Sequence, residues 1–223
     1  NRFRFRSLEN RTETSANADG WTDLLDGTGV DAWQKTGPFH REGDLLIAGE
    51  QGLAVSRGQF DDFELQFEWR ISQGGNAGVI YRQPDPNVPL SPALNLEFQL
   101  LDNQGARFNE DERRQTAAVY GVLAPRRDAT MTAGQFNSSR IVCRGSRAEH
   151  WVNGEQVLTY DSESPEWAAA IAAGTEDVKS YVDAGDDDVL RSQNGYLMLQ
   201  CHTGDVAFRN VRIRELPSPQ PGG

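Results

Sequence analysis

The chain has 223 residues, and its 33 Asp and Glu against 22 Lys and Arg give a formal net charge of -11 at pH 7. This acidic balance argues against general binding of nucleic acid, which depends on cationic surface, and against attachment to anionic membranes. No segment approaches the roughly 18 consecutive apolar residues that a membrane-spanning helix needs. A hydrophobic content of 37%, with 10 Phe and 5 Trp, is too high for a disordered chain.

The chain is predicted to form one domain between two peripheral ends. Residues 1–18 are expected to be an N-terminal extension, and residues 217–223, which are rich in Pro and Gly, a flexible tail. No internal repeat or linker interrupts residues 19–216, so we expect a single unit there. The 22 Gly and 10 Pro imply many turns, which favour a β-rich protein.

Strict alternation of apolar and polar residues predicts β-strands. It is clearest over residues 63–71, where every second side chain from Phe63 to Ile71 is apolar. Further strands are expected at 79–82, 94–100, 139–144, 150–152, 156–160, 196–202 and 206–213. Asn153-Gly154 predicts a tight hairpin turn. A slip in apolar parity between Phe208 and Val211 predicts a bulge.

One segment breaks this pattern and predicts a short helix. Ser164 is a suitable N-cap, Pro165 suits the first helical position, and Gly174 can end the helix. An acidic loop is expected to follow as far as Asp188. Residues 161–191 hold nine Asp or Glu and two Lys or Arg, so most of the net charge is concentrated there. Short alternating strands with one apolar face predict an all-β sandwich of two antiparallel sheets packed face to face.

Polar residues on two of these strands form the candidate site. Glu97 and Gln99 share the outer face of one strand, and Gln200 and His202 share the outer face of another. Such carboxylate, imidazole and carboxamide groups can bind sugar hydroxyls, and Glu97 or His202 can serve as a general base.

Arg82, after a glycine-rich turn, and Tyr120 complete the predicted substrate-binding set. The plainer interpretation is an ordinary solvated strand face, which also carries Glu, Gln and Arg; this is the interpretation preferred for Glu64, Gln66 and Glu68.

Other kinds of site receive little support. The chain has no GxSxG elbow, P-loop, HExxH or GxGxxG followed by a helix. Its two cysteines, Cys143 and Cys201, fall in predicted strands; we expect two buried thiols, with a single disulfide as the alternative. The three His residues show no spacing typical of a metal site, and the acidic run after residue 182 lacks the alternation of a calcium loop.

The ordered motifs of the chain resemble the 3-keto-disaccharide hydrolase family, long catalogued as a domain of unknown function. The resemblance covers about residues 20–216. The motifs that carry it are Gly20-Trp21-Thr22-Asp23, Phe60-Asp61-Asp62-Phe63, Gly75-Asn76-Ala77-Gly78, Leu96-Glu97-Phe98-Gln99, Val119-Tyr120-Gly121, Trp151-Val152-Asn153-Gly154 and Leu199-Gln200-Cys201-His202. Ala77, Phe136 and Cys201 depart from the family's usual Ser, Trp and Asp.

The resemblance implies a concanavalin A-like jelly-roll sandwich and an enzyme that cleaves 3-keto-glycosides, as a hydrolase or as an elimination-type lyase. It implies Glu97 or His202 as base or metal ligand, with Arg82, Gln99, Tyr120 and Gln200 holding the carbohydrate substrate. A divalent metal could stabilise an enolate, but no spacing demonstrates one. A secreted or periplasmic location is expected from the family's habits.

Two alternatives to the enzyme stay open. One is a non-catalytic, lectin-like carbohydrate-binding module, which should expose coplanar Trp or Tyr side chains along a groove. The other is a surface or scaffold protein without a small-molecule site. The enzyme hypothesis requires Glu97 and His202 to lie on the same face of the molecule, with a perturbed pKa in the site.

Overall fold

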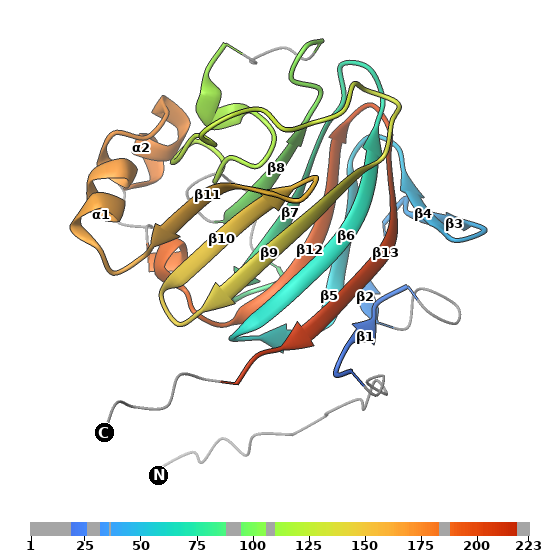
Figure 1. Ribbon diagram of the computed structural model, residues 1–223, viewed down its shortest axis with the longest axis horizontal. Coiled ribbons are helices and arrows are strands. Elements are labelled where there is room, and N and C mark those ends of the chain that lie inside the picture. Colours follow the sequence, from blue (N-terminus) through green and yellow to red (C-terminus); the bar gives the residue numbers. More distant parts are fainter. Residues whose placement is uncertain are drawn as a thin grey trace.

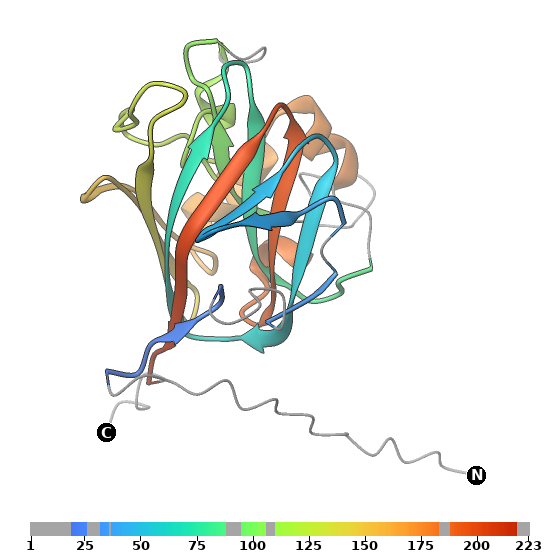
Figure 2. The same ribbon diagram turned by 90° about the vertical axis from the view of Figure 1, so that its right-hand side faces the viewer.

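The computed structural model describes residues 19–25, 32–35, 37–87, 95–105, 110–182 and 188–217. They form two antiparallel β-sheets packed face to face (Figures 1 and 2), as the alternation predicts. Sheet A has the order β11-β10-β9-β6-β13-β4-β3, with β1 also paired to β13, and sheet B has the order β2-β5-β12-β7-β8. The all-β sandwich is therefore confirmed.

The strands of each sheet come from distant parts of the chain. Sheet A contains β1 (Thr22–Asp23), β3 (His40–Glu42), β4 (Leu45–Ala48), β6 (Phe63–Ile71), β9 (Asn137–Arg144), β10 (Arg147–Val152), β11 (Glu155–Asp161) and β13 (Val206–Glu215). Sheet B contains β2 (Trp33–Lys35), β5 (Gly52–Phe60), β7 (Asn76–Gln83), β8 (Leu96–Leu101) and β12 (Gly195–Thr203). All of these strand pairs are antiparallel.

Three local predictions are confirmed. The strand expected at 63–71 coincides with β6. Asn153 and Gly154 both have positive φ, at 49° and 84°, in the turn between β10 and β11. The pairing of β13 with β6 shifts register between Arg209 and Arg212, which places a bulge where the apolar parity slips.

β5 was not predicted because both faces of its first half, residues 52–56, are largely buried. Ala54 belongs to the main core between the sheets, whereas Val55 belongs to a second apolar cluster on the outer face of sheet B. A strand with two apolar faces does not alternate, so its sequence lacks the signal that identified β6. The sequences of the short strands β1 to β4 also lacked a clear alternation of apolar and polar residues.

Two helices, rather than one, lie at the edge of the sandwich beside β11 and β8 (Figure 1). α1 (Pro165–Ala172) begins as predicted, because the Ser164 hydroxyl accepts a hydrogen bond from the Trp167 amide at 3.1 Å. The prediction of a continuous acidic loop after it is wrong, because α2 (Glu176–Val182) follows. Acidic residues at the start of α2 complement the positive end of its helix dipole.

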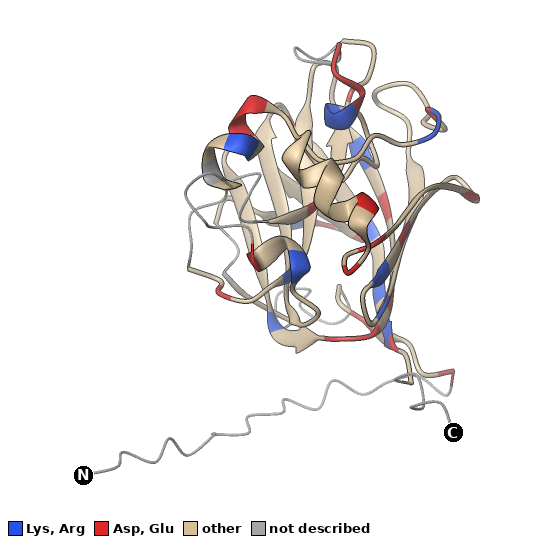
Figure 3. Cartoon of the chain, turned by 90° about the vertical axis from the view of Figure 1, so that its left-hand side faces the viewer, with Lys and Arg blue, Asp and Glu red and all other residues tan. Residues whose placement is uncertain are grey.

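The helices belong to the sandwich because apolar residues from both enter the main core. Two 3-10 helices, η2 (Glu112–Arg114) and η3 (Asp188–Arg191), flank this part of the molecule. Acidic and basic residues are interspersed over the surface (Figure 3). The predicted N-terminal extension, residues 183–187 of the acidic run and the tail after Pro217 lie outside the described residues.

The two cysteines are buried and unpaired, as the preferred interpretation holds. Cys143 lies on β9 and Cys201 on β12. None of the described helices is long and apolar enough to cross a membrane.

A chain of buried hydrogen bonds crosses the core between the sheets. His150 on β10 is fully buried, with Nδ1 2.8 Å from the Ala117 carbonyl oxygen and Nε2 2.8 Å from the Tyr81 hydroxyl. Because a carbonyl only accepts, Nδ1 carries the proton, Nε2 accepts from Tyr81, and the Tyr81 oxygen accepts from Tyr160 at 3.0 Å. The chain joins β10 and β11 of sheet A to β7 of sheet B and to the segment at residue 117.

Burial lowers the pKa of His150 to about 4, so the imidazole is neutral at pH 7. The unfolded chain takes up this proton near pH 6.5, whereas the folded chain does so only near pH 4. We expect the contribution of His150 to the free energy of unfolding to be fully present above pH 6.5. The free energy of unfolding should then fall by on the order of 3 kcal/mol as the pH drops to about 4. Denaturant unfolding at a series of pH values measures this.

The matched variant is His150→Gln, which keeps polar atoms but does not titrate. It should be less stable at pH 7 by about 1–3 kcal/mol, because buried partners lose hydrogen bonds. Between pH 4 and 6.5 its stability should depend less on pH than that of the natural chain. Equal pH dependence in both proteins would contradict the assignment.

Candidate active site

The predicted polar residues of β8 and β12 lie on one face of the molecule, the outer face of sheet B. Leu199 and Cys201 of β12 point into the main core, so Gln200 and His202 point outward. On β8, likewise, the side chains of Glu97 and Gln99 point outward, since their neighbours Leu96, Phe98 and Leu100 are in the core. The condition that Glu97 and His202 share a face is met.

Strand register places a glycine at the centre of this face. Gly78 on β7 pairs with Gln200 on one side and with Gln99 on the other. The Cα atoms of the two glutamines are therefore about 10 Å apart, two strand spacings, with no side chain between them. A side chain from a neighbouring strand can therefore occupy this gap.

The Glu97 side chain occupies this gap. A Cβ atom added at Gly78 would lie 2.0 Å from Glu97 Oε1 and 2.7 Å from its Cδ atom. Any other residue at position 78 would therefore displace the carboxyl group. The sequence motif around Gly78 was interpreted as a turn, but the function of this glycine is to leave space for Glu97.

The surroundings of Glu97 favour its neutral form. Its cross-strand neighbour is Ile80, which forms with Val55 and Met198 a fully buried apolar cluster on this outer face. Burial raises the pKa of Glu97 to about 8. No described side chain forms an ion pair or hydrogen bond with the carboxyl, so nothing compensates for its lost hydration. This is the perturbed pKa that the enzyme hypothesis requires.

Gln99 presents a second polar atom without a partner. The side chain is only 1% exposed, and its Oε1 atom has no hydrogen-bond partner among the described residues. Leaving a buried carbonyl oxygen unpaired is costly, and such atoms are rare in folded proteins. An unpaired amide beside an unpaired carboxyl is typical of a site shaped to receive a polar ligand.

Tyr120 lies at the edge of the same face. Residues 117–120 continue sheet B beyond β8: the Ala117 amide donates to the Gln99 carbonyl at 2.8 Å, and the Tyr120 amide to the Glu97 carbonyl at 3.1 Å. Burial raises the pKa of the Tyr120 phenol, and the nearby Glu97 carboxylate adds to this effect. The phenol is therefore protonated at neutral pH and available as a hydrogen-bond donor.

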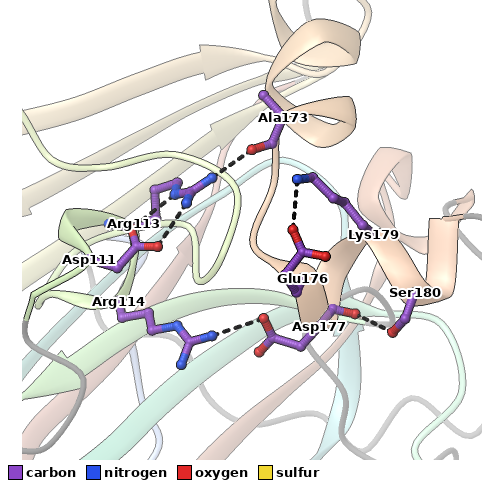
Figure 4. A network of polar contacts seen from close by, with 8 residues as sticks. All are labelled: Asp111, Arg113, Arg114, Ala173, Glu176, Asp177, Lys179 and Ser180. Atoms are coloured by element: carbon purple, nitrogen blue, oxygen red, sulfur yellow. Dashed lines mark hydrogen bonds and ion pairs between the residues drawn. The ribbon is translucent and has the colours of Figure 1, made fainter.

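η2 and the two helices fix this edge in place (Figure 4). Arg113 donates to the Ala173 carbonyl at 2.6 Å, and Arg114 forms an ion pair with Asp177 of α2 at 3.0 Å. The Arg114 guanidinium also lies 5.8 Å from the centre of the Tyr120 ring. No local pattern indicates these contacts, because they join segments some 60 residues apart.

His202 lies further along β12 than Gln200 and is exposed. The pairing of β12 with β7 shifts register between Cys201 and Thr203, next to this residue. Its backbone carbonyl accepts a hydrogen bond from Gln51 at 3.1 Å. His202 thus belongs to the rim of the face, whereas Glu97 and Gln99 lie within it.

Arg82 does not belong to the site, so its predicted role in binding substrate is wrong. Its side chain is 2% exposed and donates to the Gly145 carbonyl at 2.7 Å and to the Asp61 carbonyl at 2.8 Å. A φ of 54° at Arg82 takes it out of the alternation of β7. Arg82 therefore joins the β5–β6 turn to the β9–β10 turn and has a structural role.

Known proteins share both the sequence pattern and the fold. The model of the 3-keto-alpha-glucoside-1,2-lyase-like domain family matches residues 20–214. The chain belongs to this family. A curated relative, the 3-keto-disaccharide hydrolase of Bacteroides thetaiotaomicron, is 26% identical over 232 aligned positions, which cover 89% of this chain and 79% of the relative.

Two solved structures from Parabacteroides distasonis, each named a "putative glycosyl hydrolase", share the fold of this family member. The first has a TM-score of 0.78 and 23% identity, covering 90% of this chain and 96% of its own. The second has a TM-score of 0.70 and 20% identity, covering 88% and 99%. At these sequence identities the similarity shows a shared fold and nothing further.

The described residues of this family member do not form a metal site by themselves. Within the ranges that the structure describes, no group of three or more His, Cys, Asp or Glu side chains is arranged to hold an ion. Glu97 is surrounded by apolar side chains and glutamines rather than by further metal ligands.

Gly78→Ala tests the role of the gap. The clash is with the end of a flexible side chain and not with backbone, so the protein should fold while the Glu97 carboxyl moves toward solvent. We expect near-natural thermal stability together with a pKa of Glu97 that falls from about 8 toward its usual 4.5, measured by NMR titration of the carboxyl carbon.

Gly49→Ala is the matched control. A Cβ atom there would meet only Asp205 Oδ1, at 3.4 Å, an ordinary contact that does not involve Glu97. It should leave the titration of Glu97 unchanged. An unchanged titration in Gly78→Ala as well would show that the glycine does not determine where the carboxyl lies.

Proposed function

We propose that the chain is a carbohydrate-active enzyme that cleaves glycosidic bonds in sugars bearing a ketone at C3, with Glu97 as the general base. The observation that carries the proposal is the half-buried carboxyl of Glu97, which lies in the gap above Gly78 and has no partner among the described side chains. The family and the substrate named for the curated relative support the choice of 3-keto sugars.

The chemistry needs one base rather than two carboxylates. A ketone at C3 acidifies the hydrogen at C2, so a base can remove that proton and leave an enolate. The electron pair then re-forms the ketone and creates a C1–C2 double bond, while the glycosidic oxygen departs from C1 and takes up a proton. Addition of water across this double bond gives the hydrolysis product, whereas release before addition gives the lyase product.

Glu97 suits the first step because of its pKa. A carboxylate with a pKa near 8 is a stronger base than an ordinary one, and about a tenth of it is ionised at pH 7, a fraction that grows as the pH rises toward 8. We assign the unpaired Gln99 oxygen and the Gln200 and Tyr120 side chains to binding of sugar hydroxyls, and His202 to the outer rim of the bound sugar.

Glu97→Gln tests the base directly. The substitution preserves shape but cannot accept the proton, so kcat/KM on a 3-keto-glucoside should fall by about 10²–10⁴-fold. The unoxidised glucoside should not be cleaved by either protein. In heavy water, exchange of the C2 hydrogen, followed by NMR of the sugar, should be lost in the variant along with cleavage.

Two control variants separate the roles. Glu149→Gln changes a carboxyl on the opposite sheet, hydrogen-bonded to the Trp151 indole, and should retain full activity. His202→Ala should chiefly raise KM and leave C2 exchange intact. Full activity of Glu97→Gln, or loss of exchange in His202→Ala alone, would refute Glu97 as the base.

The pH dependence follows from the direction of the shift. Below its pKa Glu97 is protonated and cannot act as a base, so kcat/KM of the natural enzyme should rise with pH, reach half its maximum near pH 8 and level off about one pH unit higher. The rise should be absent from the residual activity of Glu97→Gln. Initial rates at subsaturating substrate between pH 5 and pH 10, with stability checked at each value, measure this. A profile that changes little between pH 6 and pH 10 would contradict the assignment.

A further inference from the structure

The outer face of sheet A, opposite to the face that carries Glu97, holds a groove. Its volume is about 670 Å³, within the range of sites that bind small molecules. The floor comes from the central strands β6, β9 and β13, and Trp21 and Trp151 stand at its sides. None of its lining residues has a role in the proposed catalysis, so binding in the groove would be independent of the Glu97 chemistry.

The strand register aligns four residues of the groove in one row across neighbouring strands of sheet A. Arg212 on β13 pairs with Gln66 on β6, Gln66 pairs with Arg140 on β9, and Arg140 pairs with Trp151 on β10. Arg212 and Trp151 are therefore three strands apart, about 14 Å between backbones. The row is wider than a single sugar ring, so the groove has room for an oligosaccharide.

The polar groups of this row are held in place before any ligand binds. The Arg140 guanidinium lies 4.0 Å from the centre of the Trp151 ring, and that of Arg212 lies 4.7 Å from the centre of the Trp21 ring. Arg212 also donates twice to Gln66 Oε1, at 2.7 and 3.1 Å. Fixed donors of this kind bind a ligand without the entropic cost of ordering them.

Charges in the groove are nearly balanced, which argues for a neutral ligand. Although burial opposes it, hydrogen bonds from Arg214 and Gln66 keep the pKa of Glu64 low, and Asn210 and Arg209 do the same for Glu68. Both carboxylates are thus ionised beside their arginines, and Asp23 faces Arg212 across the β1–β13 pair. Residues of both signs line the strands of this sheet (Figure 3).

Hydrogen-bond donors and acceptors are both present along the floor and rim of the groove. Arginine N–H groups, the Gln66 and Asn210 amides, the Ser138 hydroxyl and the Glu68 carboxylate all line the same space. Sugar hydroxyls both donate and accept, so they match such a mixture. The tryptophans, whose ring faces lie against arginine side chains, add apolar surface to the walls of the groove. From these features we infer that the groove is a second, non-catalytic binding site for neutral oligosaccharides.

NMR of the tryptophan indole N–H signals tests this inference. Trp33, Trp69 and Trp167 are fully buried in the core, whereas Trp151 and the 7% exposed Trp21 line the groove, so the five signals divide into reporters and internal controls. The probes are cellotriose and maltotriose as neutral trisaccharides, and trigalacturonate as an acidic one. Millimolar cellotriose or maltotriose should shift the Trp21 and Trp151 signals and leave the other three in place.

Two variants keep the test falsifiable if one affects folding. Gln66→Ala removes the centre of the row, and Ser138→Tyr introduces a large side chain from an exposed lining position. Each should weaken binding of the trisaccharide at least about tenfold, without loss of cleavage of a small 3-keto-glucoside. Gln99→Ala, on the opposite sheet, should leave the shifts unchanged.

Three results would overturn the inference. They are the absence of shifts at Trp21 and Trp151 with both neutral trisaccharides, shifts that occur only with trigalacturonate, and shifts that survive Gln66→Ala and Ser138→Tyr but vanish in Gln99→Ala. The last would assign the binding to the Glu97 face.

Discussion

The hydrogen bonds of His150 are the constraint on which the arrangement of the site depends. His150 links the two sheets through Tyr81 and, by its other ring nitrogen, fixes the carbonyl of Ala117. Residues 117–120 in turn pair with β8, the strand that carries Glu97 and Gln99. A histidine with no part in the chemistry thus sets the edge of the face on which the chemistry is proposed to occur.

The chemical character of that face comes from Glu97, whose carboxyl loses hydration without gaining a charged or hydrogen-bonding partner among the described side chains. Elsewhere in the molecule, buried carboxylates such as Glu64 have arginine partners and keep low pKa values. Glu97 has apolar neighbours instead, and it can lie across the strand only because Gly78 has no side chain. Among the described residues, the fold therefore holds one face where Glu64 and Glu68 are paired with arginines and another where Glu97 has no partner. The paired face suits binding, and the unpaired one suits proton transfer.

The sequence was sufficient to predict the sandwich and the shared face of Glu97, Gln99, Gln200 and His202, because alternation along one strand fixes which side chains point the same way. It could not show that Gly78 makes room for Glu97, since that depends on register between strands. Arg82 was misassigned because a positive φ takes it out of the alternation. The groove of sheet A was missed because its walls come from distant segments, and its floor has the composition of any exposed strand.

The most direct test of the central claim is the titration of Glu97 in the free protein. With carbon-13 in the glutamate side chains, the Glu97 carboxyl signal is the one that disappears in Glu97→Gln, and it can be followed from pH 4 to pH 10. We predict a midpoint near 8, with the carboxyl neutral at pH 7. A midpoint near 4.5 would mean that Glu97 is an ordinary solvated carboxylate, and the proposed base would have to be sought elsewhere.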